Sequence, residues 1–264
     1  MFHATLDSTK TWKQIVDALA TLLTEAHLII SDGKKTEGRK SDVEGITLRQ
    51  LDSSKAAMVD LRLPSSVFQE YTCKGEHDVC LGIDELVRVS KRMGGDERLE
   101  FNLDESDKRL EIKMIGQAER QFKLQLLTPP DSQTNKPGME FGVKAEMYAD
   151  AFKQAIKDVG VVSSHVKISA EKNLITFTGE GDTGEARITL TTEGEDPALF
   201  QLKVGAGQTT AMYALNYLTE ISKAIASDSI ILQFSESKPM MLEFPIAAEA
   251  GNISFILAPR VERR

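Results

Sequence analysis

Hydrophobic residues recur three or four positions apart in four segments of the chain, two in each half. The positions are Ile15, Val16, Leu19, Leu22 and Leu23; Leu86, Val89 and Met93; Phe152, Ile156 and Val159; and Leu215, Leu218, Ile221 and Ile225. This spacing places the apolar side chains on one face of a helix. The pattern therefore predicts two amphipathic helices in each half of the chain.

Apolar and polar residues alternate in the stretches between these helices. The stretches are Met58–Leu63, Leu99–Leu103, Phe122–Leu126, Val166–Ile168, Ala186–Leu190 and Ile230–Phe234. Alternation with a period of two is typical of half-buried β-strands, and short connections favour antiparallel hairpins. The predicted fold class is α+β, with two helices packed on antiparallel sheets in each half.

The two halves of the chain resemble each other in sequence. The stretch that starts at Asn216 matches the stretch that starts at Asp84 at a constant offset of 132 positions, and Phe152–Ile156 matches Trp12–Val16 at an offset of 140. Between the halves, residues 128–138 contain three prolines and several small polar residues, which oppose both helices and central strands. We therefore predict two similar domains, residues 1–127 and 139–264, joined by a linker at 128–138.

Composition and charge restrict the class of protein. The chain has 264 residues, of which 41% are hydrophobic and 27% charged, as expected for a globular protein of about two domains. No apolar run reaches the 18 or so residues of a membrane span, and the first residues do not resemble a secretory signal, so a cytoplasmic or nuclear location without membrane contact is expected. The net charge of −8 argues against nucleic-acid binding unless the cations are gathered in one place.

The sequence contains no pattern typical of a catalytic, metal or cofactor site. The four histidines lack ligand spacing, and Cys73 and Cys80 are expected to be buried thiols rather than a disulfide. Gly179–Gly184 fits the pattern G-x-G-x-x-G, but an alternating stretch follows it where a nucleotide site needs a helix. We expect a hairpin turn here and no enzyme, with a nucleotide-binding enzyme as a minor alternative.

Basic residues gather on the predicted helices. They are Lys10, Lys13, Arg88, Lys91, Arg92, Lys153, Lys157 and Lys223. Arg88, Lys91 and Arg92 follow the i, i+3, i+4 spacing that places them on one helical face. Such faces are often simply solvated, but the repeat retains Lys13 with Lys153 and Lys91 with Lys223, which indicates a shared purpose.

Several segments resemble a known family. Leu51–Ser54, Val59–Leu61, Phe68–Tyr71, Phe234–Pro239 and Phe255–Glu262 are similar to the sliding clamps of the proliferating cell nuclear antigen (PCNA) family. The resemblance covers nearly the whole chain, and the ending without a long acidic tail is more similar to the archaeal branch. It implies a non-catalytic DNA polymerase processivity factor, a ring of three chains around double-stranded DNA. DNA would be bound without sequence preference through the eight basic residues named above, and no cofactor or metal is implied.

The resemblance also implies two kinds of protein contact. Subunits would join by strand addition, with Phe122, Leu124 and Leu126 of one chain running antiparallel to Ala186, Ile188 and Leu190 of a neighbour. DNA polymerase, flap endonuclease, DNA ligase and a clamp loader would be the partners, the enzymes docking a short peptide in a pocket beneath the linker. The pocket positions that match are Leu51, Met58, Pro137, Met139, Pro239, Ile256 and Ala258, although Leu51, Met58 and Ile256 are equally expected as core residues.

Two questions stay open at this point. The chain forms either a homotrimer or one subunit of a heterotrimeric or checkpoint-type clamp with altered partners. Residues 32–44 combine four basic with four acidic residues and almost no apolar ones, which predicts a solvated surface loop with, as the alternative, a regulatory or partner-contacting role.

Overall fold

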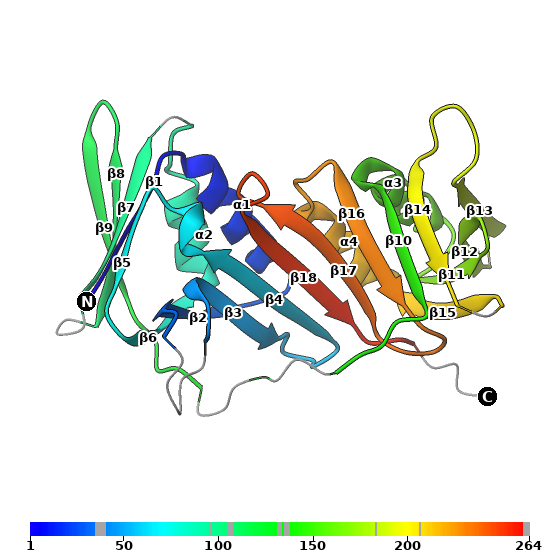
Figure 1. Cartoon of the computed structure of the whole chain (residues 1–264), viewed down its shortest axis with the longest axis horizontal. Helices are drawn as coiled ribbons and strands as arrows, with labels where there is room; N and C mark the ends of the chain where they lie inside the picture. The colour runs from blue at the N-terminus through cyan, green and yellow to red at the C-terminus, as the bar shows by residue number, and fades with distance from the viewer. Residues whose placement is uncertain are drawn as a thin grey trace. The chain divides into compact units, whose positions relative to one another are not determined.

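The computed structural model shows the chain as helices and antiparallel strands (Figure 1). The structure describes residues 1–34, 41–95, 97–104, 108–130, 134, 138–182, 184–205 and 207–260. The strands pair antiparallel, for example β7 (Arg98–Asp104) with β8 (Arg109–Ile115) and β11 (His165–Glu171) with β12 (Leu174–Gly181). The predicted α+β class, with two helices in each half, is confirmed.

The chain forms two compact units. The first comprises Met1–Ser53, Val59–Lys136 and Pro245–Ile253, and the second comprises Ser54–Met58, Pro137–Phe244 and Ser254–Arg264. Each unit therefore takes a short segment from the half of the sequence that forms most of the other. The two units are described separately below.

In the residues that the structure describes, the first unit contains two sets of paired strands and two α-helices. One sheet has the order β5 (Glu70–Cys73), β1 (Phe2–Leu6), β7 (Arg98–Asp104), β8 (Arg109–Ile115) and β9 (Glu119–Gln125). The other strands follow the order β4 (Ala57–Pro64), β3 (Glu44–Leu51), β2 (Glu25–Asp32) and β6 (Glu76–Gly82), with the short 3-10 helix η1 (Ser65–Val67) after β4.

Helices α1 (Thr9–Ala20) and α2 (Ile83–Ser90) pack on each other, and they contact β1 and β6 respectively. Trp12 of α1 and Phe101 of β7 are buried with their rings 4.7 Å apart, and Leu86 of α2 is buried as well. The predicted apolar positions that lie on these helices therefore form their buried faces, while Leu22 and Leu23 follow the end of α1.

The second unit repeats this architecture. One set of strands follows the order β14 (Leu199–Val204), β10 (Val143–Tyr148), β16 (Ser229–Phe234) and β17 (Met240–Ile246). Strand β18 (Gly251–Leu257), like β4 and β17, has residues in both units. The four-stranded sheet has the order β13 (Gly184–Thr191), β12 (Leu174–Gly181), β11 (His165–Glu171) and β15 (Thr209–Ala214).

Helices α3 (Ala149–Val159) and α4 (Leu215–Ala224) cover the sheets of this unit. Helix α3 contacts β10 and β16 as well as β11, β12 and β13, so its apolar face lies in the core between two sets of strands. Phe152 of α3 meets Phe177 of β12 edge to face at 6.0 Å, and both are fully buried.

The helix positions agree with the internal repeat. Helices α1 and α3 begin 140 positions apart, and α2 and α4 begin 132 positions apart, the same offsets that the sequence comparison gives. Two units with similar element order follow from one repeated apolar pattern.

Helix α2 is shorter than the pattern predicts. It ends at Ser90, and the amides of Arg92 and Met93 donate to the carbonyls of Val89 and Ser90 in tight three-residue turns. Gly94 and Gly95 follow, and glycine disfavours continuation of the helix. Arg92 therefore lies in a turn and not on the helical face that its spacing to Arg88 predicts.

The Gly179–Gly184 motif forms a hairpin, as expected. β12 pairs with β13 so that Gly181 lies directly opposite Gly184. A Cβ atom at Gly179 would overlap Val159 at the end of α3, and one at Gly181 would overlap the carbonyl oxygen of Val162. The glycines thus allow the hairpin to approach the end of α3 closely, which explains the motif without a nucleotide.

The 32–44 segment is described only in part. β2 ends at Asp32 and β3 begins at Glu44, while residues 35–40 lie outside the described residues. Three residues before β3, the Ser41 amide donates a hydrogen bond to the Glu76 carboxylate at 2.9 Å. Of the linker 128–138, residues 131–133 and 135–137 also lie outside the described part of the chain.

Candidate nucleic-acid interface

In the first unit, the five candidate cations lie on two helices that touch and on the turn after the second. Lys10 and Lys13 belong to α1 and Arg88 to α2, while Lys91 directly follows the last residue of α2 and Arg92 lies in the same turn. Lys13 is half-buried and the other four are exposed. The fold therefore brings these cations to neighbouring elements, although they are up to 82 positions apart in sequence.

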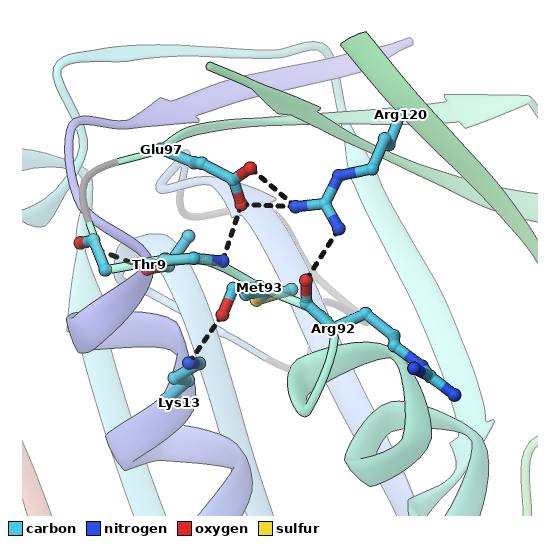
Figure 2. Close-up of polar contacts among 8 residues, drawn as sticks. Thr9, Lys13, Arg92, Met93, Glu97 and Arg120 are labelled. Atoms are coloured by element: carbon cyan, nitrogen blue, oxygen red, sulfur yellow. Dashed lines mark hydrogen bonds and ion pairs between the residues drawn. The ribbon is translucent and has the colours of Figure 1, made fainter. Parts of the chain in front are cut away.

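The turn that follows α2 is tied to its surroundings by side chains (Figure 2). We call residues 91–95 and 97 the α2–β7 turn. On one side Lys13 Nζ donates to the carbonyl of Met93 at 2.7 Å. On the other, Arg120 of β9 donates to the carbonyl of Arg92 at 2.7 Å and to both carboxylate oxygens of Glu97.

The surroundings of Glu97 favour its charged form. Its carboxylate accepts a hydrogen bond from the Gly94 amide at 2.7 Å, and this bond, followed by the Arg120 guanidinium and the Lys13 ammonium, lowers the pKa of Glu97 despite its partial burial. The group is therefore an anion held among cations.

In the second unit, the three candidate cations lie on α3 and α4. Lys153 and Lys157 belong to α3, and Lys223 lies in the last turn of α4. Lys157 and Lys223 are exposed, and Lys153 is half-buried. Helices α3 and α4 contact each other, as α1 and α2 do in the first unit.

Three candidate cations share one local arrangement. Each forms an ion pair with an acid three positions earlier on its own helix: Arg88 with Glu85 at 2.8 Å, Lys153 with Asp150 at 3.5 Å and Lys223 with Glu220 at 2.6 Å. Such exposed pairs contribute only about 0.2–0.5 kcal/mol. The acids reduce the local positive charge without holding the basic side chains firmly.

The candidate subunit-contact residues lie on strands at sheet edges. β9 ends the five-stranded sheet and β13 ends the four-stranded sheet in the described strand orders. Phe122, Leu124, Ala186, Ile188 and Leu190 are all half-buried and alternate with exposed residues. Leu126, also half-buried, lies just beyond β9, where its amide donates to the Lys108 carbonyl at 2.9 Å.

The candidate peptide-pocket residues differ in exposure. Met58 and Ile256 are buried, with exposed fractions of 6% and 5%, and Ala258 is exposed. Leu51, Met139 and Pro239 are half-buried, and Pro137 lies outside the described residues. In the second unit the Ala258 amide donates to the Ala56 carbonyl at 2.9 Å, which fixes the chain after β18 beside the start of β4.

Sequence reasoning missed two features. The Glu97–Arg120 ion pair joins residues that are 23 positions apart on different elements, and no periodic pattern indicates such a contact. Tyr148 and Phe200 form an exposed aromatic pair with ring centroids 4.3 Å apart, because Tyr148 ends β10 next to the edge strand β14.

Neither a metal centre nor a membrane segment emerges within the described ranges. They contain no group of three or more His, Cys, Asp or Glu side chains placed to hold an ion. None of the helices there is long and apolar enough to cross a bilayer.

Comparison with known families covers almost the entire chain. The model of the PCNA N-terminal domain matches residues 1–128, and the model of the PCNA C-terminal domain matches residues 136–260. The chain belongs to the PCNA family. This agrees with the resemblance of the short sequence segments and with the two repeated units.

Individual PCNA-family proteins match over nearly their full length. The protein named DNA polymerase sliding clamp of Thermococcus sibiricus is 32% identical over 262 residues, 99% of each chain. That of Thermofilum pendens is 34% identical over 253 residues, 95% of this chain and 96% of its own.

Solved PCNA structures have the same fold. The PCNA of Thermococcus kodakaraensis superimposes with a TM-score of 0.88 at 27% identity, covering 98% of this chain and all of the other. The PCNA of Entamoeba histolytica gives a TM-score of 0.87 at 22% identity, which supports the fold alone.

Proposed function

We propose that this chain is a DNA polymerase sliding clamp, which encircles double-stranded DNA and keeps replication and repair enzymes on it. The observation that carries the proposal is full-length similarity to proteins of that name, at 32% identity over 99% of both chains. The basic residues of the four helices supply the chemistry, since lysine and arginine bind phosphates without regard to base sequence. The chain is a DNA-associated protein in this proposal.

The mechanism requires no catalysis. A clamp that tethers an enzyme to its template converts repeated encounters into an intramolecular one, which raises the effective concentration of the enzyme. Lys10, Lys13, Arg88, Lys91 and Arg92 are the proposed phosphate contacts of the first unit. In the second unit these are Lys153, Lys157 and Lys223. With a net charge of −8, repulsion from the remaining surface favours DNA only at the basic residues of each unit.

Ring closure is assigned to the edge strands. An unpaired strand edge presents amide and carbonyl groups ready for another chain, and strand addition satisfies them. Pairing of β9 with β13 of a neighbour would also cover the half-buried side chains of Phe122, Leu124, Ala186, Ile188 and Leu190. The proposed assembly is a homotrimer of two-domain chains with domains 1–127 and 139–264.

In this proposal, each partner enzyme binds through a short peptide that docks in a pocket at the linker 128–138. The proposed lining combines Leu51, Met58, Met139, Pro239, Ile256 and Ala258, together with Pro137. Apolar anchors of a short peptide supply most of the affinity in such contacts. The proposed partners are DNA polymerase, flap endonuclease, DNA ligase and a clamp loader.

The test combines polymerase stimulation with oligomeric mass. Arg88→Glu with Lys91→Glu should abolish stimulation of a polymerase on primed DNA while the mass stays that of a trimer. The matched control is Lys203→Glu with Lys238→Glu, which reverses two exposed lysines that do not belong to any of the four helices and should leave stimulation intact. Unchanged stimulation in the first variant would refute the assignment of the basic residues. A monomeric or dimeric mass for the unsubstituted chain would instead favour a heterotrimer subunit.

A further inference from the structure

The α2–β7 turn carries two of the proposed DNA contacts and is held unusually firmly. Its sequence includes Gly94 and Gly95, which lose much conformational freedom when they are fixed in one geometry. Four side chains fix it nevertheless, two from α1, one from β9 and one from the turn itself. They are Thr9, Lys13, Glu97 and Arg120.

On the α1 side, the turn is held through its carbonyl groups. The Thr9 hydroxyl is buried and hydrogen-bonds to the Gly94 carbonyl and, at 3.3 Å, to that of Gly95. The Lys13 ammonium donates to the Met93 carbonyl at 2.7 Å. These contacts anchor the turn to the first two turns of the helix that carries Lys10.

On the β9 side, one arginine and one glutamate complete the arrangement. Arg120 donates to Glu97 at 2.5 and 2.6 Å and to the Arg92 carbonyl at 2.7 Å, so a single planar guanidinium bridges a side chain and the backbone of the turn. Glu97 in turn accepts the Gly94 amide at 2.7 Å. Glu97 is the only one of these groups that contacts both Arg120 and the glycine backbone among the described residues.

The side chains that the turn presents are left available for a ligand. Lys91 and Arg92 are exposed, and neither takes part in an ion pair within the ranges that the structure describes. Figure 2 shows the Arg92 guanidinium directed away from the Glu97–Arg120 pair, even though its carbonyl is bound by Arg120. The network therefore fixes the backbone and leaves both cations to solvent.

We propose that Glu97 is a positioning residue for DNA binding: through Arg120 and the Gly94 amide it holds the α2–β7 turn so that Lys91 and Arg92 meet the phosphates. This inference rests on the proposed function. It assigns a favourable effect on DNA binding to a carboxylate. Simple Coulomb repulsion between a carboxylate and phosphate predicts the opposite sign.

Positioning by Glu97 and Coulomb repulsion by Glu97 have opposite effects on DNA binding, so one substitution can distinguish them. Glu97→Gln keeps an oxygen acceptor for the Gly94 amide but removes the ion pair with Arg120. If the turn then adopts its binding geometry only one-tenth to one-third of the time, the apparent dissociation constant for DNA rises about three- to tenfold. The matched control is Glu85→Gln, which removes a carboxylate from the same basic surface, where Glu85 is paired only to the exposed Arg88 among the described residues. It should leave DNA binding unchanged or tighter.

Binding is measured by fluorescence anisotropy with a short labelled duplex of mixed sequence at low ionic strength, using the assembled full chain. A double-substitution cycle separates positioning from general damage. In a Lys91→Met, Arg92→Met background, Glu97→Gln should no longer weaken binding, because the side chains that it positions are gone. Thermal unfolding and oligomeric mass are recorded for each variant.

Three results would overturn the inference. Glu97→Gln could tighten binding as Glu85→Gln does, it could leave binding unchanged, or it could weaken binding equally in the Lys91→Met, Arg92→Met background. In each case the unsubstituted chain still binds DNA and the proposed function stands. Absence of DNA binding and of polymerase stimulation by the unsubstituted chain would overturn the proposed function and the inference together.

Discussion

Replacement of Ile188 by aspartate should disrupt assembly of the chain. Ile188 lies on the edge strand β13, on the face that also carries Ala186 and Leu190, and its side chain is half-buried in the isolated chain. The proposed subunit contact would cover the remaining half. A residue on this face is therefore predicted to matter for association more than for folding of its own unit.

The size of the effect follows from the burial. Full burial of an isoleucine side chain stabilises by about 1.5–3 kcal/mol, so covering the second half contributes about 1 kcal/mol. A carboxylate placed in the contact would also lose hydration, at a cost of several kcal/mol for an ion, or at least about 3 kcal/mol. Together these terms amount to at least about 4 kcal/mol, which raises the dissociation constant of each interface at least about 700-fold.

The assay is light scattering after size exclusion over a dilution series. On dilution, the unsubstituted chain should retain the mass of a trimer at protein concentrations at which Ile188→Asp has already dissociated. Thr189→Asp is the matched control, because it introduces the same charge on the adjacent, exposed position of β13. Equal loss of mass in both variants, or no loss with Ile188→Asp, would refute the assignment of this strand face to the interface.

Three further predictions concern the separate units. Phe152→Ala should lower the free energy of unfolding by about 3–5 kcal/mol in urea titrations, because the ring is fully buried; a loss below 1 kcal/mol would contradict the packing of α3. Glu97 has a lowered pKa in the fold, so its contribution to stability is present above the unfolded pKa of about 4.3 and disappears as the pH falls through the lower folded value; the stability difference between the unsubstituted chain and Glu97→Gln should shrink below about pH 4, and a constant difference would contradict this. Iodoacetamide should modify the half-buried Cys73 in the folded protein but Cys80 only after unfolding, as mass spectrometry of peptides would show, because burial raises the pKa of the Cys80 thiol; equal labelling would refute the burial.

The sequence predicts the regular parts of this fold well because their signals are local and repeated. The 140-position offset between Trp12–Val16 and Phe152–Ile156 reappears as the offset between the starts of α1 and α3. The Gly179–Gly184 hairpin is likewise predictable, since the residues that follow it alternate as a strand does. In both cases a pattern within a few residues determines the structure.

The candidate site is predictable only in part, because tertiary contacts have no such local signal. The spacing of Arg88 and Arg92 predicts one helical face, yet α2 ends at Ser90 and the turn beyond it owes its geometry to contacts with α1 and β9. Lys13, expected as a phosphate contact, also donates to the Met93 carbonyl 80 positions away. Its role as a DNA contact remains a prediction, with a structural role beside it.

The arrangement of acids beside the proposed DNA contacts suits a protein that moves along its ligand. Arg88, Lys153 and Lys223 each have an acid one helical turn before them, and such exposed pairs contribute only about 0.2–0.5 kcal/mol. When the basic side chain exchanges that acid for a DNA phosphate, the free energy of the complex changes little. No single position along the DNA backbone therefore becomes a deep free-energy minimum. A contact surface without such acids would bind phosphates more strongly, and each step along the DNA would then have to break stronger contacts. In the proposed clamp the ring, and not the strength of each ion pair, keeps the protein on DNA, which allows the individual contacts to remain weak.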